Sequence, residues 1–492
     1  MENNVSGFQS FVQTLNEFLS IGTNILFDHV VFAVFVVVAL LFTILIKGAQ
    51  FKYALHAGSL LFAKHHGGGT SGFASYAIST ASRVGTGNMA GIMVAITAGG
   101  PGALFWMWIM ALFGSALAFA EATIAQLYKE KNSLGHYVGG ASYYIRSKLK
   151  LPIVAVIFAL IMIVTYTAFN GVQANTIAGA LSTYNVSTEV TAIVLVVLTA
   201  IILFYPGRTS IIKVCTYIIP VMAVPYLLLG LFILFKNFDL VPAMISTILK
   251  DAFSGPEAAG GGFLGAAVVV GLKRGLFSNE AGMGGAPHAA AAATTTHPAR
   301  QGFIQMFSVF TDTLLICSIS GFILLLSPEA LELAGSSDSY NGIKLMQFAM
   351  GTHFGTFGSV FVTVCVLLFS FSSILGNFFY IQTGATAIKD NVPSYVIVVL
   401  MTLVLVYFGS IVDLSVIWNL GDFLMGFMAL LNIATLILLY KPVKALLENY
   451  ISQWNKEQIP VYIKGDIPEI EDDAITQWNG QDSYSIKMPP RD

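Results

Sequence analysis

Long apolar runs separated by short polar connections dominate the chain. Runs of about 18 to 25 residues match a helix that crosses a hydrocarbon core about 30 Å thick. Eleven such runs predict an all-α membrane protein with eleven transmembrane helices. Their approximate bounds are 29–47, 73–98, 103–128, 153–181, 190–205, 211–235, 262–293, 303–326, 357–381, 395–408 and 414–440. Beyond residue 440 the composition becomes polar, which predicts a soluble, partly disordered tail over 441–492.

The positions of Lys and Arg orient these runs. Cytoplasmic loops of membrane proteins accumulate basic residues. Most of the basic residues here lie after odd-numbered runs, whereas the opposite side holds only Lys236, Lys250 and Lys344. The N-terminus is therefore expected outside and the C-terminal tail in the cytoplasm.

Two of the runs are interrupted near their middle. The second contains Gly85-Thr86-Gly87-Asn88, and the seventh contains the polar stretch 273–284. Each glycine weakens a helix by about 1 kcal/mol relative to alanine, and lipid cannot satisfy the freed backbone groups, so a break must face protein or water. The seventh run lies five runs after the second, an odd offset, so the chain crosses the two breaks in opposite directions. This predicts a 5+5 inverted repeat, with repeat one at about 73–235, repeat two at about 262–440 and helix 29–47 as an addition. The alternative interpretation is that the glycines only allow close helix packing.

The two breaks offer opposite partial charges. The half-helix expected to start at Met89 directs its amide end at the first break, which suits a carboxylate. The half-helix expected to end near Phe277 offers carbonyl oxygens, which suit an ammonium group or a small cation. Neutral polar side chains accompany both breaks: Thr86, Asn88, Ser278 and Asn279. Together these features predict a site for a zwitterion.

Six of the charged residues within the runs are candidates for a structural or functional role: Arg83, Glu121, Lys273, Arg274, Glu280 and Asp312. Arg83 and Glu280 are both on the cytoplasmic side of a break, so we expect them near each other, as a gating or structural charge pair. For Glu121 and Asp312, a structural hydrogen bond and a role in ion or proton transport both remain open. Lys273 and Arg274 either extend toward the outer surface or take part in function.

Two further groups of polar residues lie in the apolar runs. Ser370, Ser372 and Ser373 either bond back to their own helix or provide oxygen ligands for a hard cation such as sodium. The second group either lines the pocket or bridges helices: Phe169, Asn170 and Gln173.

Composition limits the possible functions. Of 492 residues, 56% are hydrophobic and 10% are charged, which excludes a soluble globular protein. The net charge of −2 gives no support for a nucleic-acid partner. Cys215, Cys317 and Cys365 stand singly in apolar runs, without disulfide or metal-ligand spacing. HExxH, GxSxG and paired catalytic carboxylates are missing from the sequence, so an enzyme is not expected.

Three motifs carry a family resemblance. Val84–Gly91 (VGTGNMAG), Gly99–Trp108 (GGPGALFWMW) and above all Lys273–Gly284 (KRGLFSNEAGMG) resemble the alanine or glycine:cation symporter family. The resemblance implies a leucine-transporter-type fold and sodium-coupled uptake of a small neutral amino acid, such as alanine or glycine, by a monomer in a bacterial-type inner membrane. It also implies ligands for the amino-acid carboxylate (Thr86, Gly87), its amino group (carbonyls around Phe277 and Ser278) and sodium (Ser372, Ser373 and the Ala81 and Val84 carbonyls).

The chain departs from the family pattern in the ninth run. Ser373 and Asn377 stand where the family usually has Thr and Trp. The serine keeps a hydroxyl for sodium, while the carboxamide leaves more room and adds hydrogen-bonding capacity. We therefore expect glutamine or asparagine to be accepted. Proton coupling through Glu121, Glu280 or Asp312 is the nearest alternative. An ion channel is the alternative of another class, although the polar residues cluster at mid-depth and do not form a continuous pore.

Overall fold

The structure, a computed structural model, describes residues 2–63, 69–204, 207–254, 265–336, 342–412 and 415–479. These residues are mostly helical, as expected for an all-α membrane protein. The first half holds α1 (Glu2–Ile25), α2 (Phe32–Leu45), α3 (Ala49–Lys52), α4 (Ala54–Ser59), α5 (Gly72–Arg83), α6 (Thr86–Gly99), α7 (Gly102–Leu127), α8 (Ala141–Ser147), α9 (Pro152–Ser182), α10 (Thr188–Phe204), α11 (Arg208–Lys236) and α12 (Val241–Ala252). The second half holds α13 (Ala266–Asn279), α14 (Pro287–Ala292), α15 (Pro298–Val309), α16 (Ser318–Leu325), α17 (Pro328–Ser336), α18 (Ile343–Phe354), α19 (Thr356–Ile388), α20 (Val392–Ile411), α21 (Ser415–Leu438) and α22 (Tyr440–Asn455).

Short elements connect or interrupt these helices. π-helical turns join α1 to α2 and α15 to α16: η1 (Leu26–Val31) and η4 (Phe310–Cys317). Two 3-10 turns are η2 (Phe238–Leu240) and η5 (Pro468–Ile470). Strands β1 (Glu130–Lys131) and β2 (Tyr137–Val138) pair antiparallel, with Glu130 opposite Val138.

Eight helices of the described chain are long and apolar enough to cross a membrane: Gln13–Leu45, Gly102–Leu127, Pro152–Ser182, Arg208–Lys236, Pro298–Leu325, Thr356–Ile388, Val392–Ile411 and Ser415–Leu438. The three other predicted spans correspond to shorter helices, namely α10, α5 with α6, and α13 with α14. The count of eleven therefore stays a prediction.

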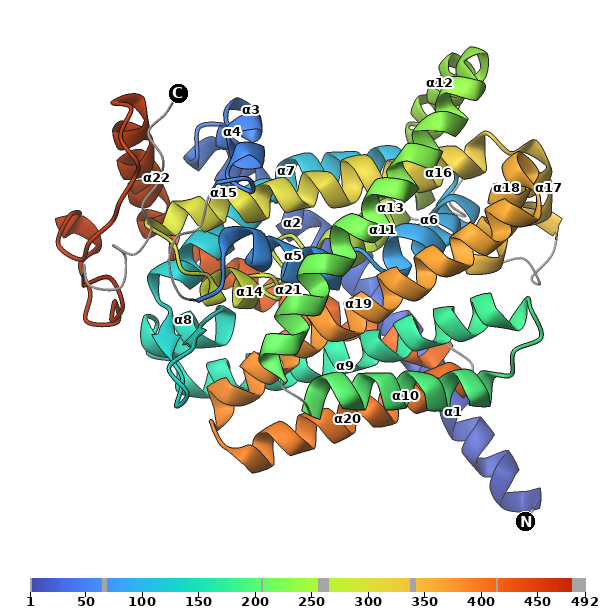
Figure 1. The fold of residues 1–492 in the computed structure, drawn as a ribbon, viewed down its shortest axis with the longest axis horizontal. Helices are drawn as coiled ribbons and strands as arrows, with labels where there is room; N and C mark the ends of the chain where they lie inside the picture. The colour runs from blue at the N-terminus through green and yellow to red at the C-terminus, as the bar shows by residue number, and fades with distance from the viewer. Residues whose placement is uncertain are drawn as a thin grey trace.

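Both predicted interruptions are present. α5 ends at Arg83 and α6 begins at Thr86, one turn before the expected start at Met89. α13 ends at Asn279, and α14 begins only at Pro287. Figure 1 places these short helices inside the bundle, between α7, α11 and α19. The breaks are thus surrounded by protein, as the unsatisfied backbone requires.

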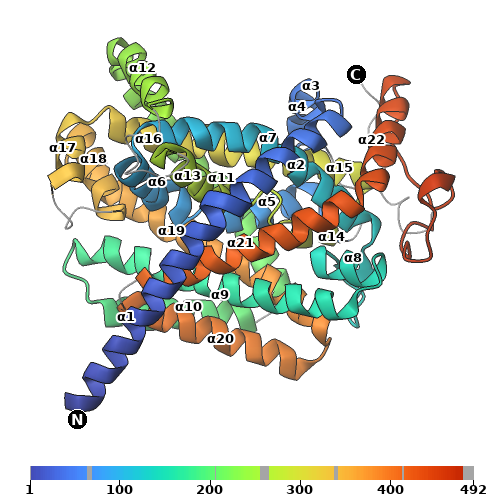
Figure 2. The same ribbon diagram turned by 180° about the vertical axis from the view of Figure 1, so that it is seen from behind.

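The long helices lie roughly along a common direction (Figure 1). α3, α4, α8 and α22 gather at one end of the bundle, and α17 and α18 at the other. Figure 2 shows α1 and α21 crossing side by side on the opposite face, where they pack against each other. The outer surfaces of α10, α11 and α20 expose many large apolar side chains, as lipid contact requires.

The first helix and the C-terminal segment differ from the predicted bounds. The first helical segment begins at Glu2, not at His29, and α2 ends at Leu45. Within the predicted tail, residues 441–479 are ordered, because α22 and the segment after it pack against the bundle and bury Trp478. Residue 262, the predicted start of repeat two, and residues 480–492 of the predicted tail lie outside the described residues.

Candidate functional site

The first break frees two carbonyl groups by redirecting two amides. The Gly85 N–H donates to Asn88 Oδ1 at 3.1 Å, and the Asn88 N–H donates to Gly85 O at 3.2 Å. In an uninterrupted helix these amides would have bonded to the carbonyls of Ala81 and Val84. A Cβ at position 85 would lie 2.2 Å from Ser373 Oγ, so only glycine lets α19 approach the break this closely.

The freed carbonyls belong to a cluster of five oxygen atoms. Ser373 Oγ lies 2.8 Å from Ala81 O, 3.3 Å from Val84 O and 3.1 Å from Phe369 O. Ser372 Oγ lies 2.9 Å from Phe369 O. The two hydroxyl protons cannot satisfy all the lone pairs of the five oxygen atoms. The lone pairs that stay free can coordinate a hard cation. The sequence predicted four of these residues and missed Phe369, although a hydroxyl three or four residues along a helix regularly reaches that carbonyl.

Asp312 joins the two breaks. Asn88 Nδ2 donates to Asp312 Oδ1 at 2.7 Å, and Ser278 Oγ donates to Asp312 Oδ2 at 2.7 Å. Asn279, at the end of α13, donates to Thr313 Oγ1 at 3.1 Å. Asp312 and Thr313 lie in the π-helical turn η4, a distortion that often marks functional sites in helices. The predicted polar residues of the two breaks therefore meet, through one buried carboxylate.

A second buried carboxylate holds the unwound segment after α13. Glu121 accepts hydrogen bonds from the Gly282 and Gly284 amides at 3.3 and 3.1 Å, and from Asn432 Nδ2 at 2.8 Å. Glu280 at the start of this segment has φ of 55°, an unfavourable region for a residue with a side chain. Of the two interpretations left open for Glu121, the structure supports the hydrogen-bonding one.

Hydrogen bonds tie the predicted pocket residues of α9 to α6 and α19. The Thr86 N–H donates to Gln173 Oε1 at 2.8 Å, and Thr86 Oγ1 lies 3.1 Å from Ser370 Oγ. Asn377 Nδ2 donates to Asn170 Oδ1 at 2.9 Å. Asn170 Nδ2 is buried and makes no hydrogen bond to the described residues. That donor is available to a ligand in the site.

An aromatic cluster adjoins the start of α6. A Cβ at Gly87 would lie 2.9 Å from Phe277 Cδ1, so glycine allows this ring to lie against the break. The Phe277 ring contacts Phe169 edge-on, with centroids 4.8 Å apart, and lies 5.0 Å from the Trp418 ring. Sequence reasoning missed Trp418. The ten predicted substrate residues are all buried: Thr86, Gly87, Asn88, Phe169, Asn170, Gln173, Phe277, Ser278, Asn279 and Asn377.

The two predicted charge partners lie close but make different bonds. Arg83 donates to Ser308 and, at 3.4 Å, to Gln305 Oε1. Glu280 Oε1 lies 2.8 Å from Ser82 Oγ. Within the described residues, Arg83 forms no ion pair with Glu280 closer than 4 Å, so the role of the two as a charge pair stays a prediction.

Lys273 and Arg274 do not extend into solvent. Both contact Asp422 of α21, with Lys273 Nζ 3.1 Å from Asp422 Oδ2. The Arg274 guanidinium also lies 4.8 Å from the Trp418 ring centroid. Asp422 was missed, although an acidic residue in an apolar run is itself a signal for a buried partner.

Comparisons with known proteins identify the family of the chain. Residues 12–464 match the model of the sodium:alanine symporter family. The amino-acid carrier protein AlsT of Bacillus subtilis is 38% identical over 93% of this chain and 96% of its own length. A Bacillus subtilis protein named probable sodium/glutamine symporter GlnT is 36% identical over 96% of this chain and 97% of its own length. The sodium/alanine symporter AgcS of Methanococcus maripaludis is 35% identical over 78% of this chain and 86% of its own length.

The family resemblance inferred from three motifs is thus confirmed over nearly the whole chain. With its apolar helices, the protein is a multi-pass membrane transporter that moves an amino acid together with a cation. The chain belongs to the sodium:alanine symporter family.

Proposed function

We propose that this protein uses a sodium gradient to drive the uptake of a small neutral amino acid by alternating access. The observation that carries the proposal is the meeting of two interrupted helices at one buried site, joined through Asp312. α6 directs its amide end at the site and α13 its carbonyl end, so an amino acid's carboxylate and ammonium group find opposite partial charges.

The fold consists of eleven spans, ten of which form two inverted repeats of five at about 73–235 and 262–440. Helices five spans apart pack against each other, which supports this arrangement: α6 against α13, α7 against α15, α9 against α19 and α10 against α20. α1 begins at one end of the bundle and α22 lies at the other (Figure 1), as an odd number of crossings requires. The distribution of basic residues favours an outside N-terminus and a cytoplasmic C-terminal tail, with a single copy acting in a bacterial-type inner membrane.

Sodium binds among the five oxygen atoms contributed by α5 and α19. Three are backbone carbonyls and two are the hydroxyls of Ser372 and Ser373. The donor set is neutral and all oxygen, which fits a monovalent hard cation. Because Ala81 and Val84 end the first half-helix, the bound ion fixes the position of the break and so completes the carboxylate site formed by Thr86 and Gly87.

The preferred substrate carries a polar side chain. Asn170 Nδ2 is a buried donor without a partner, and Asn377 adds a second carboxamide beside it. A buried polar group left unpaired costs about 1 to 3 kcal/mol, and a carboxamide oxygen from glutamine or asparagine would satisfy it where an alanine methyl group would not. The probable sodium/glutamine symporter GlnT is among the similar proteins.

The structure fits a state that is closed on the outer side. Arg274 and Lys273 of α13 reach Asp422 of α21, and the rings of Phe277 and Trp418 lie beside them. In the proposed orientation these contacts lie between the site and the outer surface. Separation of α13 from α21 would open the site outward.

Proton coupling is the second candidate, and one observation favours it. Glu280 Oε2 is buried within a membrane-spanning region and has no hydrogen-bond partner among the described residues, so a proton there would relieve a costly buried charge. Removing sodium at constant pH separates the two candidates. If transport is coupled to sodium, accumulation should stop, and if it is coupled to protons, accumulation should continue.

The test is uptake by purified protein in proteoliposomes, with labelled alanine and labelled glutamine measured separately. An inward sodium gradient should drive accumulation of at least one of them above the outside concentration, and unlabelled glutamine should compete with alanine. Accumulation that does not depend on sodium would contradict sodium as the coupling ion. Alanine uptake that a large excess of glutamine leaves unchanged would contradict the side-chain preference.

A further inference from the structure

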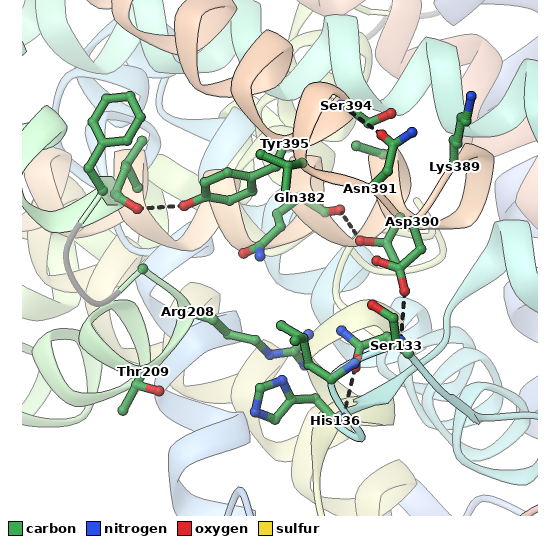
Figure 3. A pocket seen from close by; sticks show the side chains of 18 residues that line it. Ser133, His136, Arg208, Thr209, Gln382, Lys389, Asp390, Asn391, Ser394 and Tyr395 are labelled. Atoms are coloured by element: carbon green, nitrogen blue, oxygen red, sulfur yellow. Dashed lines mark hydrogen bonds between the residues drawn. The ribbon is translucent and has the colours of Figure 1, made fainter.

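A separate pocket lies where α10 and α19 end and α11 and α20 begin, next to the β1–β2 connection (Figure 3). Its volume is about 440 Å³, within the range of about 300 to 1,000 Å³ typical of small-molecule sites. None of its lining residues belongs to the transport site. Its position at the margin of the bundle puts it near the membrane surface.

Arg208 extends into this pocket from the first position of α11 (Figure 3). Its guanidinium donates one hydrogen bond, at 2.8 Å, to the Tyr137 carbonyl oxygen and lies 4.6 Å from the Phe379 ring centroid. In the described part of the chain, no carboxylate lies within 4 Å of it, whereas neighbouring Arg146 pairs with Glu130 at 2.8 Å. A guanidinium with five donors and only one such bond is suited to a phosphate or carboxylate.

The other polar walls favour an anion that also carries hydroxyl groups. Gln382 points into the pocket, and its Oε1 is buried without a donor among the described residues. Asp390 is the acidic residue of the lining, but its carboxylate accepts the Ser133 N–H at 2.7 Å. Burial and the charge of Arg208 lower the pKa of His136 below its ordinary value of 6.5, which favours the neutral imidazole at pH 7. With Lys389, the lining has a net charge of about +1.

On the side formed by α10 and α20, the pocket lining includes exposed apolar side chains. Phe204 of α10 and Val392 of α20 line this side, and their exposed fractions are 55% and 74%. α10 and α20 pack side by side and continue this apolar surface along the bundle (Figure 1). A cationic interior beside a lipid-facing apolar surface fits an amphipathic ligand better than a small soluble anion.

We propose that this pocket binds the glycerophosphate headgroup of an anionic phospholipid, with Arg208 on the phosphate, Gln382 on a headgroup hydroxyl and the acyl chains along α10 and α20. In the proposed orientation the lipid belongs to the cytoplasmic leaflet. Only the choice of leaflet depends on that orientation. Binding is measured without sodium or amino acid, so its failure is distinguishable from failure of the transport proposal.

The experiment measures phosphatidylglycerol bound to the delipidated full-length chain by native mass spectrometry. Arg208→Gln should weaken binding about tenfold, the loss expected for one charge-assisted contact of about 1.4 kcal/mol. Arg208→Lys keeps the charge without the planar fork and should bind with intermediate affinity. Lys213→Gln is the matched control, because Lys213 is exposed on the same helix and outside the pocket.

Three outcomes decide the proposal. Equal phosphatidylglycerol binding by the wild type and Arg208→Gln overturns it. Displacement of the lipid by glycerophosphoglycerol or inorganic phosphate at similar concentrations overturns the lipid assignment and makes the pocket a site for soluble phosphate esters. If Arg208→Gln fails to give a cooperative thermal unfolding transition, Gln382→Ala takes its place, and unchanged lipid binding by that variant counts against the site.

Discussion

Replacing Ser373 by alanine tests the proposed sodium site at one atom. The hydroxyl oxygen lies 2.8 Å from Ala81 O, 3.3 Å from Val84 O and 3.1 Å from Phe369 O, so it is the atom that links α5 to α19 within the cluster. Hydrogen bonds and comparable contacts to a charged group contribute about 1.5 to 3 kcal/mol. At about 1.4 kcal/mol per factor of ten, the sodium concentration for half-maximal uptake should rise about 10- to 100-fold.

The assay is initial uptake in proteoliposomes at saturating amino acid, with sodium varied and ionic strength held constant. Ser370→Ala is the matched control, since its hydroxyl lies one turn away on α19 and contacts Thr86 Oγ1 at 3.1 Å. That variant should raise the amino-acid KM while changing the sodium dependence much less. Ser373→Thr restores a hydroxyl and should recover most of the sodium affinity.

An unchanged sodium dependence in a Ser373→Ala protein that folds and transports would refute the reasoning. It would mean that the five oxygen atoms form only structural hydrogen bonds. If Ser373→Ala instead raised the amino-acid KM and left the sodium concentration for half-maximal uptake unchanged, Ser373 would belong to the substrate site.

Three further predictions concern the substrate site, the outer contacts and the tail. In Gly87→Ala the new Cβ would lie 2.9 Å from Phe277 Cδ1. Overpacking of this kind costs about 1 to 3 kcal/mol, so the amino-acid KM should rise about tenfold in uptake assays. An unchanged KM would contradict the contact. Asp422→Asn leaves the buried Arg274 and the partly exposed Lys273 without their carboxylate. Breaking such a buried pair costs about 3 to 5 kcal/mol, so the variant should lower both Tm and uptake; a wild-type Tm would argue against the ion pairs. Burial raises the pKa of Asp472, but a backbone N–H and Lys148 outweigh burial and hold it below its ordinary value of 3.8. A carboxylate with a lowered pKa stabilises tail docking above its unfolded pKa and loses that effect as pH falls through the folded value, so limited proteolysis should find 456–479 protected down to about pH 4 and cleaved in Asp472→Asn at pH 7.

The sequence by itself determined the class of fold and the location of the two breaks. Both follow from local chemistry. A helix in lipid must be apolar over its whole length, and a stretch such as Gly85 to Asn88 cannot continue one without leaving amides unsatisfied. The hydroxyls of α19 were predictable for the same reason, because each needs only a residue type and its position along a helix. The carbonyls of Ala81 and Val84 were implied only by the family resemblance. The family resemblance then indicated which of these residues form the amino-acid site and which form the sodium site.

Only the tertiary structure decided which distant groups meet. Arg274 finds Asp422 across 148 positions of sequence, and Asp312 joins the breaks through a π-helical turn that no apolar pattern indicates. The tail was predicted to be partly disordered because its apolar residues are sparse. Yet Trp478 is buried and donates from Nε1 to Gln126 O at 3.0 Å, and the Tyr462 N–H donates to Thr296 O at 3.0 Å. The physical reason is that helix formation and lipid burial act on neighbouring residues, whereas the partner of a buried charge or ring depends on how the helices pack.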